Sequence, residues 1–181
     1  MRAISAFEVP PEADVELVSG WERAAGPEAV LYRALRADVD FRFVGVARVD
    51  APDQELAGAN VRFPAHHGLY EVAREDGTPD VAGGVVLINP FEVPGADGER
   101  FLAGWDRARA ALAPQRGYLG TRLHRAIAPA DFRFVNIARW SSPLMFARAL
   151  QRPDFQQAAQ AIPFPSHPAL YQPVRRDHDA R

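Results

Sequence analysis

An asparagine and a tryptophan, Asn136 and Trp140, lie four residues apart in the extended-looking segment FRFVNIARW. Side chains alternate across a strand, so both residues point to one face, with Cα atoms about 13 Å apart at ~3.3 Å per residue. A planar polycyclic molecule fits that separation. The indole of Trp140 offers an apolar stacking surface, and the amide of Asn136 offers a donor and an acceptor for a phenol or ketone oxygen.

A second amide and several aromatic side chains complete this candidate site. Asn89 lies in the preceding segment VVLINPF with the parity needed to face the same pocket as Asn136. The aromatic residues and the histidine that we predict to contact a substrate are Phe91, Phe132, Phe134, Tyr171 and His124.

Each of these residues also has a purely structural interpretation. A tryptophan at a strand end is usually part of the core. Asn89 precedes a proline, and an Asn-Pro pair is common in turns. Asn136 is harder to explain by packing, because asparagine is depleted in strands and its buried amide needs partners.

The chain contains the same pattern twice, which changes the expected fold. Three blocks recur in the same order: 4–24 matches 88–108, 41–52 matches 132–143, and 63–76 matches 164–177. We therefore predict a first repeat over 1–76, a turn-rich linker over 77–84, a second repeat over 85–177 and a polar tail over 178–181.

The first repeat serves as an internal control for the candidate site. It also appears shortened, with 11 positions from Pro52 to Phe63 where the second repeat has 21 from Pro143 to Phe164. We predict that the first repeat is degenerate and structural, and that the second is the active half. The amide and indole residues are absent from the first repeat: Asn136 aligns with Gly45, Trp140 with Val49 and Asn89 with Ser5.

Both repeats are predicted to have the same order of elements, and in the second repeat these elements position the candidate site residues. In the second repeat VVLINPFEV predicts a buried strand, and apolar residues recur at helical spacing in GERFLAGWDRARAALA. GYLGTRLHRAI and FRFVNIARW, joined by the short APAD, predict an antiparallel hairpin. Ser141 or Ser142 can cap a second helix with Pro143 in its first turn, and LYQPV forms a last strand.

This β-α-β-β-α-β order indicates an α+β fold of two tandem ferredoxin-like units. Both helices of a unit cover one sheet face, and Val135 and Ile137 point to the other. That face needs cover, which a second sheet supplies. We therefore expect the two antiparallel sheets to pack as an intramolecular dimeric α/β barrel, so that the chain is its own pseudo-dimer; further homodimerisation stays open.

Composition limits the class of partner. The 181 residues are 48% hydrophobic, enough to bury a core, and carry a net charge of −2 with dispersed arginines, so neither nucleic acid nor a membrane is an expected partner. The absence of cysteine excludes disulfides and thiolate metal sites and fits a cytoplasmic protein. No membrane span or signal-peptide core is evident.

The FEV…W helix entry, the FVNIARW strand and the closing HPALYQPV together resemble the antibiotic biosynthesis monooxygenase family. The resemblance covers nearly the whole chain and is most specific around Asn136 and Trp140. It implies an oxygenase pocket between a sheet and its helices. Relatives include enzymes that oxidise anthrones to quinones without metal, flavin or haem, and a branch that binds and degrades haem.

The residues are compatible with the cofactor-free reaction that this resemblance implies. Such a reaction needs a substrate that forms an electron-rich enolate, and a site that stabilises the oxyanion and excludes water. We expect a small aromatic, anthrone-like or polyketide-derived substrate and O₂ as reactants. No cofactor is expected, with reduced flavin left open.

No general base is evident from the sequence. His124 is a candidate whose parity relative to Asn136 is uncertain. His167 and Tyr171 recur as His66 and Tyr70, which favours structural roles. The arginines that could bind an anionic substituent also recur: Arg125 as Arg33 and Arg139 as Arg48. An acidic substrate needs no base.

Two other functions remain as alternatives. Haem-degrading relatives use an asparagine on the first strand and a tryptophan ending the third, matching Asn89 and Trp140, but add a histidine ligand on the second helix. Here that helix has no histidine, and glutamine, the residue it offers instead, is a poor axial ligand for haem: Gln156, Gln157 and Gln160. The other alternative is a non-catalytic protein that binds an aromatic ligand. A metal site is not expected from the histidine spacing.

Overall fold

The computed structural model describes residues 1–50 and 61–175, and it divides them between two compact units. Unit 1 contains 1–71, 126–131 and the chain from 171 onward, whereas unit 2 contains 72–125 and 132–170. The strands are β1 Arg2–Phe7, β2 Val30–Ala34, β3 Phe43–Arg48, β4 Ala65–Gly77, β5 Val85–Phe91, β6 Tyr118–Ala126, β7 Phe134–Trp140 and β8 Ala169–Pro173. The helices are η1 Pro11–Ala13, α1 Asp14–Ala24, η2 Gly95–Asp97, α2 Gly98–Leu112, α3 Pro143–Leu150 and α4 Pro153–Ala159.

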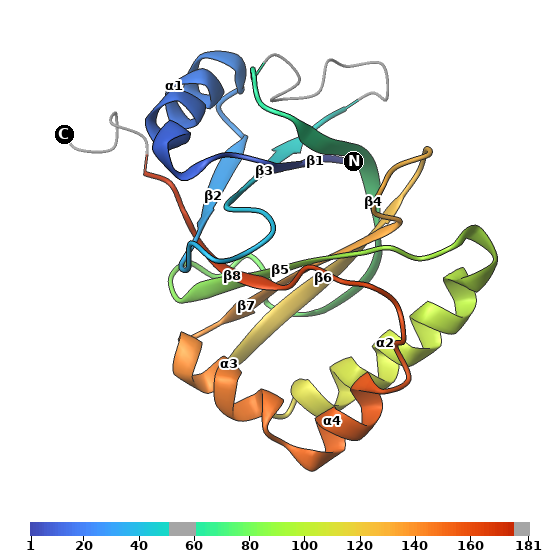
Figure 1. The fold of residues 1–181 in the computed structure, drawn as a ribbon. Helices are drawn as coiled ribbons and strands as arrows, with labels where there is room; N and C mark the ends of the chain where they lie inside the picture. The colour runs from blue at the N-terminus through green and yellow to red at the C-terminus, as the bar shows by residue number, and fades with distance from the viewer. Residues whose placement is uncertain (51–60, 176–181) are drawn as a thin grey trace. The chain divides into compact units, whose positions relative to one another are not determined.

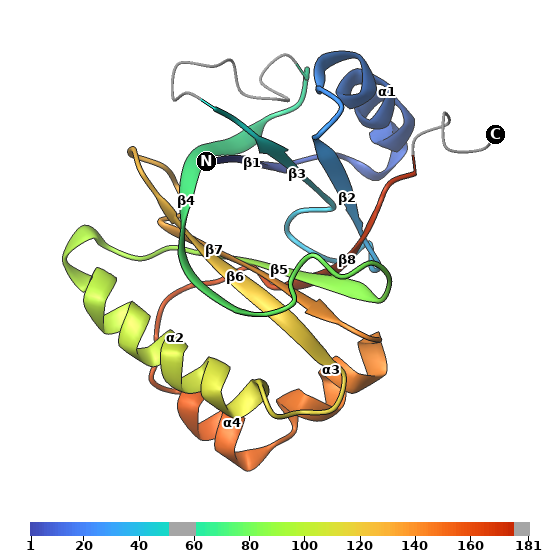
Figure 2. The same ribbon diagram turned by 180° about the vertical axis from the view of Figure 1, so that it is seen from behind.

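Unit 1 is an antiparallel sheet with one helix on it (Figure 2). In this sheet β1 pairs with β3 and β4, β3 pairs with β2, and β2 pairs with β8. Leu17 and Trp21 of α1 are buried against Phe7 and Phe43 of the sheet. This packing follows from helical spacing on α1 and alternation on the strands.

A glycine on β3 makes room for the tryptophan of α1. A Cβ atom built on Gly45 would lie 2.2 Å from Cη2 of Trp21, so the indole lies directly on the β3 backbone. Gly45 aligns with Asn136 of the second repeat. The position where the second repeat carries an amide is therefore occupied in the first by the indole of Trp21.

Unit 2 repeats the sheet with the order β5-β7-β6, again antiparallel. Asn89 of β5 and Leu123 of β6 both pair with Asn136 of β7. A bulge between Tyr118 and Gly120 shifts the register at the start of β6. The pairing of β6 with β7 confirms the predicted antiparallel hairpin.

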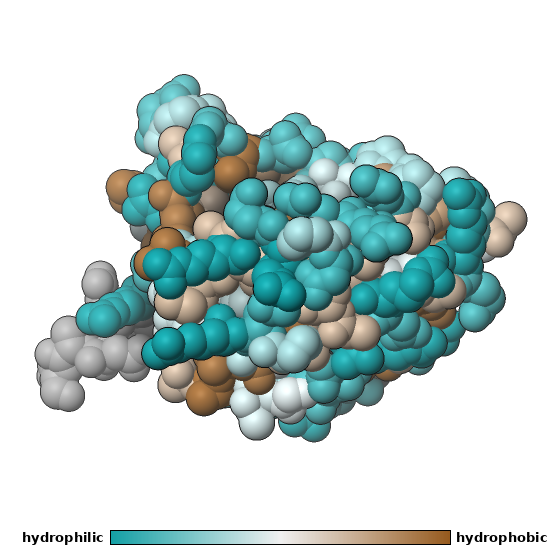
Figure 3. All heavy atoms as spheres, turned by 90° about the horizontal axis from the view of Figure 1, so that it is seen from below, coloured by the Kyte–Doolittle hydropathy of each residue, from teal (hydrophilic) through white to brown (hydrophobic). Residues whose placement is uncertain are grey.

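Three helices cover one face of this sheet (Figure 1). Phe101 and Trp105 of α2 pack with Phe91 and Phe134 of the sheet. The outer side of these helices is mostly hydrophilic (Figure 3), as expected for a surface helix with one apolar stripe. No helix among the described residues is long and apolar enough to cross a membrane.

The second predicted helix is two short helices, α3 and α4, separated by Gln151 and Arg152. The side chain of Ser142 accepts a hydrogen bond from the backbone N–H of Met145 at 3.3 Å, and Pro143 is the first helical residue. The predicted cap is therefore Ser142 and not Ser141. Pro153 begins α4, because proline fits a first turn and cannot continue a preceding helix.

The predicted fold class is confirmed. The hydrogen-bonded strand order, β1-β3-β2-β8-β5-β7-β6-β4, closes on itself, and β4 and β8 each have residues in both units. The units therefore differ from the sequence repeats within β4 and β8, and residues 126–131 of the second repeat also belong to unit 1. Residues 78–84 join β4 to β5 without a helix or strand. The predicted shortening after Pro52 and the tail over 178–181 fall largely outside the described residues.

The close contact at Gly45 predicts a stability effect that helix glycines do not share. Gly45→Ala should lower the free energy of unfolding by about 1–3 kcal/mol, because the added methyl displaces the Trp21 ring. Gly20→Ala is the matched control: its nearest neighbour is 3.7 Å away, and alanine favours a helix, so stability should stay equal or rise. Urea denaturation measures both. Equal stabilities of Gly45→Ala and the wild type would contradict this packing.

Candidate functional site

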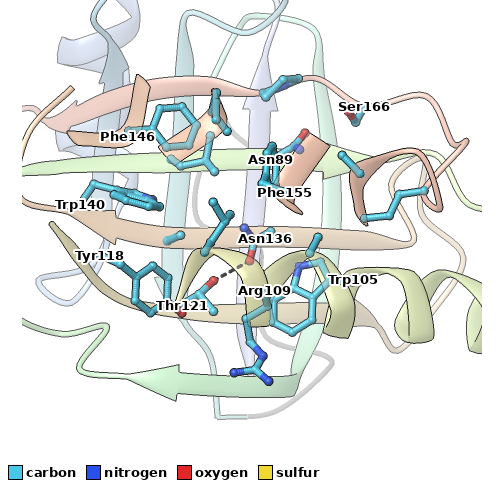
Figure 4. Close-up of a pocket in the computed structure, with 18 of the residues that line it drawn as sticks. Asn89, Trp105, Arg109, Tyr118, Thr121, Asn136, Trp140, Phe146, Phe155 and Ser166 are labelled. Atoms are coloured by element: carbon cyan, nitrogen blue, oxygen red, sulfur yellow. Dashed lines mark hydrogen bonds between the residues drawn. The ribbon is translucent and has the colours of Figure 1, made fainter. Parts of the chain in front are cut away.

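Unit 2 encloses a cavity of about 310 Å³ between its sheet and its helices (Figure 4). This volume is at the lower end for small-molecule sites, so it suits one small ligand. The sheet side is lined by Leu87, Asn89 and Phe91 of β5, Tyr118 and Thr121 of β6, and Asn136, Ala138 and Trp140 of β7. The helix side is lined mainly by Trp105, Ala108, Arg109, Leu112, Phe146, Leu150, Phe155, Ala159 and Ile162.

Three predicted site residues, Asn89, Asn136 and Trp140, line this one cavity. Asn89 and Asn136 are direct partners on β5 and β7, and Trp140 lies four residues after Asn136 on the same face. Directly opposed residues on antiparallel strands have Cβ atoms about 5 Å apart. The two amides therefore lie side by side, with the indole toward one end of the cavity (Figure 4).

A threonine on β6 fixes the orientation of the Asn136 amide. The hydroxyl of Thr121 donates to Oδ1 of Asn136 at 2.6 Å, and Thr121 is only 2% exposed. This bond turns the amide oxygen toward Thr121, so that the Nδ2 donor of Asn136 points away from Thr121 and can serve a ligand. Burial in an apolar surrounding strengthens such a bond.

Trp140 is fully buried and held by aromatic edges. Its ring centroid lies 5.5 Å from that of Tyr118 and 5.4 Å from that of Phe146, both in tilted or edge-on contacts. Gly84, with φ of +69°, lets the start of β5 approach the carbonyl of Trp140, where a Cβ atom would be 2.1 Å away. These contacts keep the indole in one orientation.

Two polar atoms at the site have no hydrogen-bond partner among the described residues. They are Oδ1 of Asn89 and Nε1 of Trp140, and both are enclosed. Buried polar atoms without partners cost free energy, so each needs a structural or functional explanation.

Arg109 and Tyr118 line the cavity and share a bonding partner, Asp76. Nη1 of Arg109 lies 2.9 Å from Oδ2 of Asp76, and the hydroxyl of Tyr118 donates to the same oxygen at 3.3 Å. Burial, with the neighbouring Asp76 carboxylate as a smaller cause, raises the pKa of Tyr118, so the phenol stays protonated at neutral pH.

The remaining predicted substrate contacts divide between the cavity and other places. Phe91 lines the cavity, whereas Phe134 is buried beneath it, stacked on Phe101 with centroids 4.4 Å apart. Phe132 is buried beside His167, with ring centroids 5.3 Å apart, and is not a lining residue.

His124 and Tyr171 lie away from the cavity, unlike our expectation. His124 pairs with Val135, so its side chain lies on the sheet face opposite Asn136, and its Nδ1 is 3.3 Å from the Val135 carbonyl. Tyr171 belongs to unit 1, where its hydroxyl donates to the carbonyl of Phe41 at 2.7 Å. We therefore assign neither residue to a substrate in this cavity.

The recurring histidines each contact a recurring glutamate. Nε2 of His167 is 2.8 Å from Glu92, and Nε2 of His66 is 3.0 Å from Glu8, its counterpart in the first repeat. Nε of Arg139 donates to the carbonyl of Pro79 at 3.2 Å. None of these side chains lines the cavity, and no Asp, Glu, His or Lys is among its described lining residues.

The cavity does not supply the ligands that haem requires. Its lining includes no His, Cys or Met, and its one tyrosine, Tyr118, is bonded to Asp76. Gln156 instead donates to the carbonyl of Leu150 at 3.4 Å. No group of three potential metal ligands occurs among the described residues. The residues present therefore do not fit a haem group.

Thr121 and Arg109 are site residues that sequence reasoning missed. The comparison of the two repeats contains the signal: Leu31 and Leu123 occupy equivalent registers, opposite Gly45 and Asn136. Thr121 therefore corresponds to Ala29, and Arg109 to Ala25. The first repeat lacks both members of the Thr121–Asn136 pair.

The Thr121–Asn136 bond predicts a large effect of an isosteric substitution. Thr121→Val should lower the free energy of unfolding by about 1–3 kcal/mol, because it leaves the Asn136 oxygen without its donor. Thr121→Ser keeps the hydroxyl and should retain most of the stability. Chemical denaturation compares the two, and a loss in Thr121→Ser with none in Thr121→Val would show that the methyl group, and not the bond, matters.

Comparisons with known proteins identify relatives of this fold. Residues 84–161 match the model of the antibiotic biosynthesis monooxygenase family. An anthrone oxidase-like protein aligns with a TM-score of 0.71 at 14% identity, covering 96% of this chain and 91% of that one. A heme-degrading enzyme from Listeria monocytogenes aligns with a TM-score of 0.56 at 15% identity, covering 95% and 99%.

Another solved structure has a higher sequence identity to this chain, but it aligns with only about half of it. SnoaB, a cofactor-independent oxygenase from Streptomyces nogalater, is 33% identical over 51% of this chain and 93% of its own, with a TM-score of 0.45 to 0.46. No curated protein matches the chain. With the family model on the second repeat and the fold shared along the whole length, the chain belongs to the antibiotic biosynthesis monooxygenase family.

Proposed function

We propose that this protein is a cofactor-independent monooxygenase that oxidises an anthrone-like polycyclic aromatic substrate to a quinone with O₂. The observation that carries the proposal is the orientation of the Asn136 amide. Its oxygen accepts a hydrogen bond from Thr121, and its Nδ2 donor can serve a ligand in a mostly apolar cavity. Membership of a monooxygenase family supports oxidation as the reaction class.

The binding mode follows from the lining of the cavity. A planar ring system lies along the sheet between the amides of Asn89 and Asn136 and the ring of Trp140, under the apolar side chains of the helices. The ketone oxygen of the substrate accepts a hydrogen bond from Asn136 Nδ2. Leu87, Phe146 and Phe155 contact the ring faces and exclude water.

The role of Asn136 is to stabilise negative charge on that oxygen. Loss of a C–H proton from the methylene carbon opposite the ketone converts the substrate into an aromatic oxyanion, and a fixed donor in a dry site stabilises it. The oxyanion transfers one electron to O₂, and the resulting radical and superoxide combine to a peroxide at that carbon. Cleavage of the O–O bond with loss of the second C–H proton yields the quinone carbonyl and water, so the substrate CH₂ and O₂ balance without a further reductant.

Proton removal relies on the substrate in this proposal. No carboxylate or imidazole is among the described lining residues, and Tyr118 is kept neutral. An anthrone is acidic because its conjugate base is aromatic. The substrate therefore loses its proton to solvent before it is enclosed, and the protein contributes charge stabilisation, orientation and exclusion of water.

Substitution of the amide tests this function directly. Anaerobic mixing with an anthrone followed by admission of oxygen should give quinone, measured by absorbance after subtraction of the uncatalysed rate. Asn136→Ala should lower kcat by about 100- to 1,000-fold, the usual effect of removing one oxyanion donor. An unchanged kcat would contradict the proposed role of the amide.

The two repeats offer a matched pair of tryptophan controls. Trp140 and Trp21 are both buried, and both have an enclosed Nε1 without a partner among the described residues. Trp140→Phe should reduce quinone formation, whereas Trp21→Phe should leave it near the wild-type rate. Equal losses would indicate that a buried tryptophan matters only for folding.

The pH dependence separates substrate acidity from a protein base. Without a base, the rate at low substrate concentration should rise with pH along the ionisation of the substrate, and an anthrone with an electron-withdrawing substituent should shift the profile to lower pH by the difference in substrate pKa. A profile that keeps one midpoint for every substrate would identify a titrating protein group instead.

A further inference from the structure

Arg109 is the one charged side chain among the described residues that line the cavity. It lies one turn after Trp105 on α2, so the two side chains share a face of the helix (Figure 4). Arg125 and Arg139, which the sequence offers for binding an anionic substituent, are not among the lining residues. A cation in a mostly apolar cavity favours a ligand with an apolar body and one negative charge, because a charge that loses water is stabilised by an opposite charge.

The arginine has an internal counter-ion that lies outside the cavity lining. Nη1 of Arg109 is 2.9 Å from Oδ2 of Asp76, and the side chains of both residues are 32% exposed. The same oxygen accepts a hydrogen bond from the hydroxyl of Tyr118 at 3.3 Å. Asp76 is not a lining residue, so the cavity surface contains the cation but not the carboxylate.

This ion pair uses one of the three guanidinium nitrogens. Nε and Nη2 of Arg109 have no hydrogen-bond partner among the described residues. Asp106, three residues earlier on α2, pairs with Arg74 at 3.4 Å instead. Nε and Nη2 form one edge of the planar guanidinium, and the two parallel N–H groups of such an edge match the two oxygens of a carboxylate. Arg109 can therefore keep Asp76 on Nη1 and bind a second carboxylate on its other edge.

The first repeat shows that the fold does not require this arginine. Arg109 aligns with Ala25, as Asn136 aligns with Gly45. Ala25 packs against the apolar core of unit 1. The cation therefore accompanies the amide and the cavity in the second repeat, and neither residue is present in the first.

We propose that Arg109 selects substrates that carry a carboxylate on a ring remote from the reacting carbon, an inference that rests on the proposed oxygenase function. The ring system lies in the apolar part of the cavity with its ketone oxygen at Asn136. The carboxylate lies at the Arg109 side, where Nε and Nη2 donate to its two oxygens. The partial exposure of Arg109 places this carboxylate where the cavity meets solvent, so that it does not need to be buried fully.

Binding of two quinones of the same shape tests this selectivity without turnover. Isothermal titration calorimetry at neutral pH compares anthraquinone-2-carboxylate with its uncharged analogue, anthraquinone-2-carboxamide. The wild-type protein should bind the carboxylate about tenfold more tightly, the size expected for hydrogen bonds to a charged group. Arg109→Met keeps the apolar part of the side chain but removes the donors, and should bind both quinones equally. Equal affinities in the wild type would overturn the proposal.

Arg107→Met is the matched control for net charge. Arg107 is exposed on the same helix and does not line the cavity, so its substitution removes the same charge without touching the ligand. The preference for the carboxylate should stay near tenfold in this variant. A loss as large as in Arg109→Met would show that the overall charge, and not a contact, sets the preference.

Asp76→Asn tests the same contact with the arginine in place. Removal of the internal counter-ion should raise the preference for the carboxylate above that of the wild type, because Arg109 then has one anionic partner instead of two. A preference that stays the same or falls would contradict direct binding by Arg109.

The two proposals fail by different results. A carboxylate preference in a protein that oxidises no anthrone would contradict the oxygenase function alone, and recognition of the carboxylate by the cavity would hold. Oxidation of anthrones together with equal affinities for the two quinones would overturn only the role of Arg109. A protein that binds neither quinone would overturn that role whatever its rate of oxidation.

Discussion

The site depends on how the tryptophan of the first helix in each repeat, Trp21 or Trp105, packs against the sheet. In the first repeat the ring of Trp21 lies on the backbone of Gly45 and fills the space between helix and strand. A side chain at the equivalent position is incompatible with that ring placement, since Cβ alone would be 2.2 Å from it. In the second repeat Asn136 stands at this position, and both Trp105 and Asn136 line the cavity. The glycine and the asparagine at equivalent positions thus accompany a different packing of the helix tryptophan in each repeat.

The open half carries a stability cost that its polar network partly offsets. Thr121 satisfies the oxygen of Asn136, while Oδ1 of Asn89 and Nε1 of Trp140 stay without partners in the described chain. Packing with aromatic edges holds Trp140, and the first repeat has neither the threonine nor the amide. Such a combination of a fixed donor and an apolar enclosure is more useful for stabilising an oxyanion than for folding.

Sequence reasoning predicted the elements of the fold because repetition and periodicity are properties of the chain itself. It also predicted that Asn89, Asn136 and Trp140 share a face, which strand parity determines. It did not predict Thr121 or the Arg109–Asp76 pair, because the register between β6 and β7 and the position of β4 depend on tertiary pairing. The face of His124 stayed open in the sequence for the same reason: the hairpin register, which pairs it with Val135, determines that face.

The most direct measurement is a crystal structure with a bound quinone product such as a hydroxyanthraquinone. The account predicts one molecule per chain, between the β5-β7-β6 sheet and helices α2, α3 and α4, with a carbonyl oxygen within hydrogen-bonding distance of Asn136 Nδ2. A quinone bound on the opposite sheet face, or equally in both repeats, would contradict it.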